Sequence, residues 1–351
     1  MRSSNILILF CLASSSLLAC SSRGTPPPSC IPGVDCPTDA GVDATDASRD
    51  AAFDAAGEAG MVRDAATDAP ADTGPLDAGP LTGDTYVFVT DVLDMAAPDP
   101  AGDPTVTFGF DLDDRVSDAM DRLGCRKVDR TSPPPDLFEG VDNELGPLLV
   151  SSEASFNFIG NLHAVVRSGE LLMLLRLRGV DDLVNDDRVE LDVIFGQLPP
   201  GAGAPTRTLA DRFEAGQTFD VQAESLDATG GALVVLPGQI VDGRFRGAAG
   251  DFTLSVPFMG RAVPLQMSGV RLRFNVVATA YDTGVLGAAL DVETTVTALV
   301  GGGVDPGVAR FVLEGAADLL PDDRRRCQSV SVALIMAGVP AVLGDTVAAT
   351  P

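Results

Sequence analysis

The residues best suited to chemistry in this sequence are oxygen-bearing side chains gathered between residues 111 and 144. The candidates for an ion-binding group are Asp111, Asp113, Asp129, Asp142 and Asn143. Calcium takes six to eight oxygen ligands, and loops that follow strands supply them readily. The pattern therefore makes Ca²⁺ the candidate cofactor of this acidic stretch.

The spacing of these acids differs from that of an EF-hand loop. Arg115 stands where a ligand would be needed, and no glycine occupies the sixth position. The alternative interpretation is a solvated acidic surface, the commoner arrangement in a chain whose net charge is −26. Both interpretations stay open at the level of sequence.

Other catalytic signatures are missing from the sequence. His163 is the only histidine and lies among apolar residues, and no G-x-S-x-G elbow or H-E-x-x-H motif occurs. Lys127, the only lysine, lacks the glycine frame of a P-loop. The sequence therefore favours a non-enzymatic binding or structural protein. A hydrolase with a carboxylate-based or calcium-dependent site is the alternative, because acids are plentiful.

The composition also restricts the partners. A net charge of −26 disfavours nucleic acid, whose phosphates need a basic surface. The chain has no tryptophan and only two tyrosines, so it offers few rings on which a sugar could stack. The protein or small-molecule ligand is not defined by these patterns.

The N-terminus has the pattern of a secretory signal. Arg2 precedes an apolar run at residues 6–13, which is shorter than the roughly 20 residues that span a bilayer. The segment Leu17-Leu18-Ala19-Cys20 resembles the lipobox of bacterial lipoproteins. That resemblance implies removal of residues 1–19, a diacylglyceryl thioether on Cys20, and anchoring to a membrane through lipid. In lipoproteins of this type, Ser21 after the cysteine favours the outer membrane.

Residues 20–82 have the composition of a lipidated, disordered stalk. Alanine, aspartate, glycine, proline, threonine and serine dominate, and aspartates recur every three to five residues over long stretches. Too little apolar surface is present to offset the entropy of ordering this segment. The lipobox and stalk resemble those of Gram-negative lipoproteins with Asp/Ala-rich stalks. The runs at 109–113, 140–145 and 327–332 are similar to exported proteins of the same group. This resemblance implies a location but no particular activity.

The cysteines predict disulfide bonds. Cys11 leaves with the signal and Cys20 carries lipid, which leaves Cys30, Cys36, Cys125 and Cys327 in an oxidising compartment. Of the three possible pairings, Cys30–Cys36 with Cys125–Cys327 is the most economical, since the first pair is local and the second joins the early and late parts of one domain.

Residues 83–351 predict one globular, mainly β domain. Turn residues separate short runs that alternate or are rich in β-branched side chains, and residues 271–276 have a clear period of two. Strands are expected at 85–90, 105–110, 171–177, 189–195, 218–223, 232–236, 239–241, 244–246, 252–256, 270–279 and 329–336. Helices are expected at 148–167, after the cap Asp291, and after Asp305-Pro306. We expect an antiparallel, sandwich-like arrangement with a few packed helices, with an α+β fold as the alternative.

The lipobox generates the first prediction. Replacement of Cys20 by serine should abolish lipidation and release the protein from the membrane, because the thioether is the proposed anchor. Radiolabelled palmitate and membrane fractionation measure both effects. The Cys11→Ser variant should stay labelled, since bulky Phe10 precedes that cysteine. A Cys20→Ser protein that is still labelled and membrane-bound would contradict the assignment.

Overall fold

The computed structural model of the chain describes residues 81–98, 102–121, 125–258 and 261–348. They all lie in the second of the two units into which the chain divides, Asp64–Pro351. The expected signal peptide, Cys20, Cys30, Cys36 and the stalk up to residue 80 lie outside the described residues. The strands are β1 (Asp84–Met95), β2 (Leu172–Val180), β3 (Asp186–Gln197), β4 (Gln217–Gln222), β5 (Val234–Val241), β6 (Arg244–Phe258), β7 (Arg261–Val277), β8 (Ala280–Asp291), β9 (Leu319–Pro321) and β10 (Cys327–Val347).

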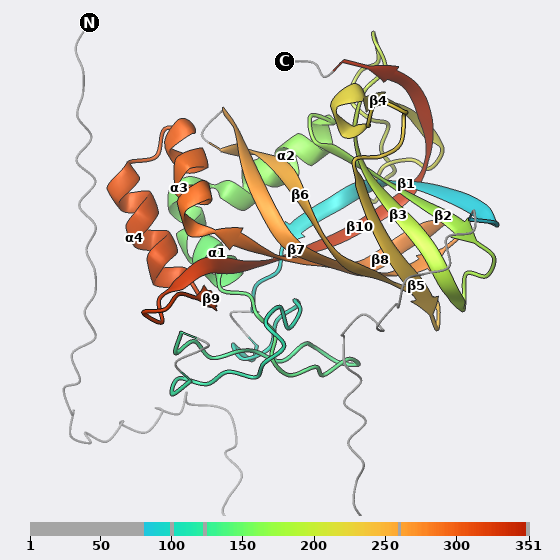
Figure 1. Ribbon diagram of the computed structural model, residues 1–351. Helices are drawn as coiled ribbons and strands as arrows, with labels where there is room; N and C mark the ends of the chain where they lie inside the picture. Colours follow the sequence, from blue (N-terminus) through green and yellow to red (C-terminus); the bar gives the residue numbers. More distant parts are fainter. Residues whose placement is uncertain (1–80, 99–101, 122–124, 259–260, 349–351) are drawn as a thin grey trace, which may run out of the picture. The chain divides into compact units, whose positions relative to one another are not determined.

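The strands form a closed ring. β1 pairs with β2, and the order continues through β3, β5, β6, β7, β8 and β10, which returns to β1. Every one of these pairings is antiparallel. The mainly β, antiparallel class is confirmed, but the expected sandwich is wrong, because the sheet closes on itself as an eight-stranded barrel (Figure 1). Alternating strands occur in both architectures, so their periodicity could not distinguish them.

Aromatic side chains fill the inside of the ring. Phe88 of β1 contacts Tyr281 of β8 edge-on at 5.7 Å between ring centroids, and Tyr281 lies 5.0 Å from Phe274. Phe274 in turn stacks on Phe245 of β6 at 4.9 Å. Such pairs add about 0.5–1.5 kcal/mol each beyond their burial. The Tyr281 hydroxyl is 2.6 Å from Thr90 Oγ1, so its polar end is also satisfied.

A smaller apolar core lies outside the ring. β4 pairs in parallel with the last part of β10 and antiparallel with the end of β3. It places Phe219 and Val221 over the outer faces of β2 and β3, where Leu174 and Ile194 are buried. These strands are therefore apolar on both faces.

Four α-helices and one short 3-10 turn, η1 (Ala223–Ser225), complete the described part of the chain. The α-helices are α1 (Leu145–Phe156), α2 (Phe158–Ser168), α3 (Val292–Gly301) and α4 (Pro306–Ala316). The single helix expected at 148–167 is instead two, because Asn157 adopts a left-handed conformation with φ 48°. The expected caps of α3 and α4 are confirmed: Asp291 accepts from Thr294 N, and Asp305 accepts from Gly307 N and Val308 N.

No helix among the described residues is long and apolar enough to cross a membrane.

Two strand expectations are corrected. Residues 105–110 form only isolated bridges, from Val106 to Thr131 and from Phe110 to Asp142. Conversely, β8 was not expected. Its residues 284–290 are buried almost without interruption, so they show no alternation to recognise. The expected strands 232–236 and 239–241 are one strand, β5, and the strands 244–246 and 252–256 are both parts of β6.

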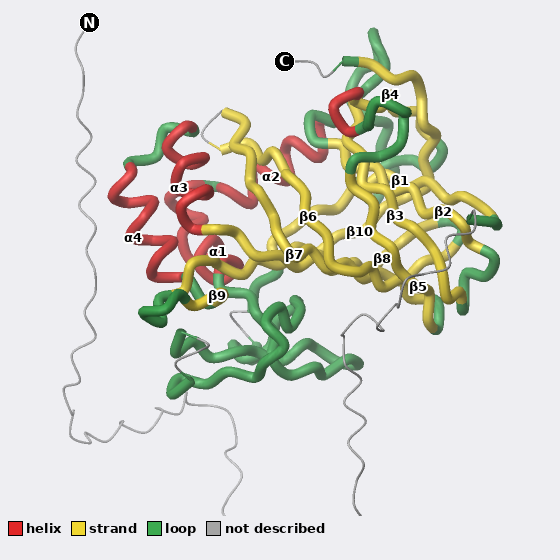
Figure 2. Tube along the Cα trace, in the orientation of Figure 1, coloured by secondary structure: helices red, strands yellow, loops and turns green. Residues whose placement is uncertain are grey.

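A long loop joins β1 to α1. Its described residues between 96 and 144 form no helix or strand, apart from isolated bridges (Figure 2). Phe110 of this loop contacts Gly287 of β8, and Arg273 of β7 lies over the Phe110 ring at 4.5 Å. The loop therefore covers the outer face of β7 and β8.

Cys125 of the loop is bonded to Cys327 at the start of β10, with 6.0 Å between the Cα atoms and a sequence separation of 202. A loop of that length removes about 5 kcal/mol of unfolded-chain entropy in the usual model. We predict that reduction, or the Cys125→Ser/Cys327→Ser double variant, lowers the melting temperature measured by calorimetry. The Cys30→Ser/Cys36→Ser variant is the control and should melt like the unaltered protein. Equal melting of oxidised and reduced protein would contradict the prediction.

Candidate metal centre

Two segments of the long loop bring three carboxylates together. Residues 110–113 and 141–142 run side by side, joined by the antiparallel bridge between Phe110 and Asp142. One oxygen from each of Asp111, Asp113 and Asp142 lies within 4.8 Å of the others. Residues that are 31 positions apart in sequence thus form one acidic group.

β7 holds the first of these segments in place. The Arg273 guanidinium is 3% exposed and lies between the rings of Phe110 and Phe138, at 4.5 and 5.5 Å. Two positions earlier, Arg271 Nη1 donates to the Asp111 carbonyl oxygen. A desolvated cation over aromatic rings contributes about 2 kcal/mol. The alternation of β7 places Arg271 and Arg273 on its outer face, where they bind the acidic loop.

Backbone amides orient the carboxylates. Leu112 N donates to Asp142 Oδ2 at 2.7 Å, and Arg115 N donates to Asp111 Oδ1 at 3.0 Å. Asp129 Oδ2 accepts from Ser117 N at 2.5 Å. The Asp113 Oδ1 atom differs from these oxygens, because it is buried and has no hydrogen-bond partner. One carboxylate oxygen of the group is therefore removed from water without a hydrogen bond from any of the described residues.

Burial raises the pKa of every carboxyl group in this acidic cluster. It raises the pKa of Asp142 to about 9, and it raises the pKa values of Asp111 and Asp129 to about 6. Neighbouring carboxylates add to each of these increases. Burial also raises the pKa of Asp113, although the Arg115 guanidinium opposes the change. Asp129 belongs electrostatically to the cluster, since Asp113 and Asp111 are among the charges that raise its pKa.

A close backbone approach completes the site. Gly140 has φ +79°, and a Cβ atom there would lie 2.6 Å from the Arg115 carbonyl oxygen and 3.1 Å from Asp111 Oδ2. Only glycine allows this contact between the two segments. No sequence pattern indicates this close approach at Gly140, because a single glycine in a Pro-rich loop is typical of an ordinary turn.

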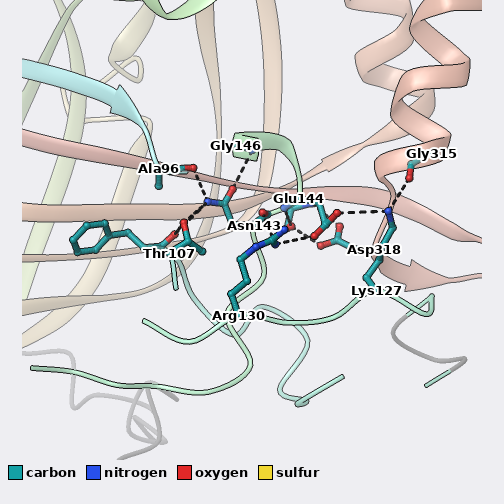
Figure 3. Close-up of polar contacts among 11 residues, drawn as sticks. Ala96, Thr107, Lys127, Arg130, Asn143, Glu144, Gly146, Gly315 and Asp318 are labelled. Atoms are coloured by element: carbon teal, nitrogen blue, oxygen red, sulfur yellow. Dashed lines mark hydrogen bonds and ion pairs between the residues drawn. The ribbon is translucent and has the colours of Figure 1, made fainter. Parts of the chain in front are cut away.

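The Asn143 side chain makes its hydrogen bonds to residues outside the acidic group. Its Nδ2 donates to the Ala96 carbonyl at 2.7 Å and to Thr107 Oγ1 at 3.2 Å, and its Oδ1 accepts from Gly146 N (Figure 3). The side chain is fully buried in these contacts. The amide therefore joins the end of β1 to the start of α1. Its expected role as a metal ligand stays a prediction.

Charged residues beside Asn143 connect the loop to β10 and α4 (Figure 3). Arg130 Nη1 donates to Glu144 Oε1 at 2.8 Å, and Lys127 Nζ donates to the Gly315 carbonyl at 2.8 Å. Glu144 N donates to Ser331 Oγ, whose hydroxyl donates to buried Asp318. The sequence did not indicate Asp318, because no local pattern shows that this aspartate becomes buried.

Two cavities are described, and they are lined by other residues. One of about 720 Å³ lies between α2, β3 and β6, and one of about 500 Å³ lies beside α4 and the disulfide. His163 is about two-fifths exposed, with Nε2 3.3 Å from Asp94 Oδ1. The carboxylates thus converge, as a hydrolytic site would require, but not inside either of these cavities.

Comparison with protein-family models, with curated proteins and with solved structures found no match for this chain. The geometry of the site is therefore the basis for assigning its chemistry.

Asp318 gives a prediction of its own, although its charge also raises the pKa of Asp142. Burial raises its pKa from 3.8 to about 7. A raised folded-state pKa contributes stability below the unfolded value, and this contribution is lost as the pH rises from about 4 to about 7. The uncharged Asp318→Asn variant should therefore gain stability relative to the unaltered protein between pH 4 and pH 8, by up to roughly 4 kcal/mol. Urea unfolding across this range measures the gain.

The exposed Asp323 supplies the control for this experiment. The Asp323→Asn variant should follow the unaltered protein at every pH. A constant difference between Asp318→Asn and the unaltered protein would show that Asp318 does not titrate as described.

Proposed function

We propose that this chain is an exported, lipid-anchored binding or structural protein whose acidic loop holds a calcium ion. The observation that carries the calcium assignment is the convergence of one oxygen from each of Asp111, Asp113 and Asp142. Asp113 also has a buried oxygen without a hydrogen-bond partner among the described residues. Buried like charges repel and cost free energy unless a cation or a proton compensates them. A cation bound here would satisfy Asp113 and reduce that repulsion.

The donor set favours a hard cation. The group is made of carboxylates, and the nearby Arg115 carbonyl adds another oxygen. Neither histidine nor cysteine is part of it, which disfavours zinc. Calcium tolerates irregular loops with mixed carboxylate and carbonyl ligands, whereas magnesium demands a near-ideal octahedron. Asp111, Asp113, Asp142 and the Arg115 carbonyl would hold the ion, and Asp129 would contribute charge.

The role of the ion would be to stabilise the loop and not to catalyse a reaction. It would join residues 111–115 to residues 140–142 and keep the long loop against β7 and β8. A hydrolase with a carboxylate site is the second candidate, and it is favoured by the spread of pKa values from about 6 to about 9 within the group. The buried Asp113 oxygen without a hydrogen-bond partner supports the calcium role instead.

The location of the protein is part of the same proposal. Cys20 with its lipobox and the Asp-rich stalk support lipid anchoring, and Ser21 supports the outer membrane. A calcium site of the weak class found outside cells, with a dissociation constant of about 0.1–1 mM, would be filled in such a compartment. The partner that the domain recognises is not part of this assignment.

Calcium should stabilise the mature protein, prepared with Cys20→Ser to keep it free of lipid. After treatment with a chelator, adding about 10 mM Ca²⁺ should increase the free energy of unfolding by roughly 1–3 kcal/mol, because the ion binds only the folded state. Calorimetric titration with Ca²⁺ and with Mg²⁺ measures affinity and selectivity. An unchanged melting temperature, or equal effects of both ions, would refute the calcium site.

Variants assign the effect to the loop. Asp113→Asn and Gly140→Ala should each abolish the response to Ca²⁺, the first by removing a ligand and the second by separating the two segments. The Asp323→Asn control removes an exposed carboxylate elsewhere and should respond fully. A hydrolase would show instead as turnover of ester or glycoside substrates that Asp142→Asn abolishes.

A further inference from the structure

One stretch of β6 has a partner strand on only one side. β7 pairs with β6 along its whole length, but β5 pairs with it only from Arg244 to Gly247. No strand of the described residues pairs with the other edge of β6 from Asp251 to Val256. The β5–β6 pairing closes the ring, but the second half of β6 is left with a free edge.

The register shows which backbone groups face this edge. Ser255 lies opposite Pro264 of β7, and Ala262 lies opposite Pro257. Proline has no N–H to give to the ladder, so these are non-hydrogen-bonded pairs, and alternation places Thr253 and Gln266 in the same class. In such pairs the N–H and C=O groups point away from the partner strand. The amides and carbonyls of Thr253 and Ser255 therefore face the open edge.

The same two residues line the larger cavity. This space of about 720 Å³ lies within the size range of ligand sites, which is about 300–1,000 Å³. Leu171, Leu172 and Phe195 supply its apolar surface, and α2 forms a wall that includes Ala164. Figure 1 shows α2 beside β6. An edge of about six residues is roughly 20 Å long, enough for one short strand.

On the opposite wall of the cavity, the backbone groups of β3 already have hydrogen-bond partners. Past Val193, where its pairing with β5 ends, β3 has its edge covered by side chains and then by β4, which pairs with Gly196 and Gln197. Phe195 N donates to Ser225 Oγ at 2.9 Å, and Gln222 Nε2 donates to the Gly196 carbonyl at 2.9 Å. Of the two strands β3 and β6, β6 is therefore the one that offers unpaired backbone groups to a ligand.

We propose that this cavity binds an extended peptide segment of a partner protein, which adds as a strand to the free edge of β6. Main-chain hydrogen bonds to Thr253 and Ser255 would supply affinity, as in other cases of strand addition. Alternate side chains of the peptide would contact Leu171 and Phe195. The partner segment would therefore alternate apolar and polar residues.

Charge and geometry favour a peptide of a partner protein over this chain's own N-terminal segment or a second copy of the chain. Glu170 and Glu224 outnumber Arg261 around the cavity, so a segment with net positive charge is favoured. The Asp-rich residues 21–80 of this chain have the wrong sign. A second copy would present its own β6 edge behind a similar wall of α2 and η1, which keeps two such edges apart. An isolated strand meets no such obstacle.

The test uses the mature chain with Cys20→Ser and a phage-displayed library of random linear peptides as the probe. We expect enrichment of basic, alternating sequences. Synthetic versions should bind Ser255→Pro about tenfold or more weakly, because proline removes one edge-facing N–H that the β7 ladder does not use. Ser255→Ala keeps that N–H and should bind like the unaltered protein.

Two further measurements keep the proposal falsifiable if Ser255→Pro does not fold. Ala164→Arg should block the cavity and weaken binding, whereas Ala228→Arg, at an exposed turn, should not. Hydrogen exchange at the Thr253 and Ser255 amides of the unaltered protein should slow when peptide binds. The proposal is overturned if no peptide is enriched, if these amides exchange unchanged, or if sedimentation shows that the edge is closed by a second copy.

Discussion

β10 uses both of its edges to close the ring, and most of the structure depends on that double pairing. Its first half lies against β8 on one side, and its middle pairs with β1 on the other. The strand also receives the connections that fix the rest of the domain. Cys327 at its start holds the long loop through Cys125, Ser331 holds Asp318 and the start of α1, and its last residues pair with β4.

The acidic loop illustrates how such a frame can hold an unfavourable group. Three carboxylates in partial burial would separate if the chain around them were free. Here the disulfide, the Arg273 guanidinium between two phenylalanine rings, and the short bridges to Arg130 and Asp142 oppose that separation. The divalent cation proposed for this site would turn the repulsion into attraction.

The two proposed sites share one pair of strands. β7 supports the acidic loop through Arg271 and Arg273 on its outer face, whereas β6 offers its free edge from Asp251 to Val256. The two strands pair from Arg244 to Phe258 of β6.

Local patterns in the sequence determined the features that depend on neighbours in the chain. The alternation at residues 271–276 indicated β7, Asp291 and Asp305 indicated helix starts, and the loop aspartates indicated an acidic group. Pairing between distant segments decided the rest. Ring closure, the burial of β8 on both faces, the use of Asn143 as a structural amide and the open edge of β6 all depend on which strands meet, because hydrogen bonds and burial between remote residues leave no periodicity in either segment alone.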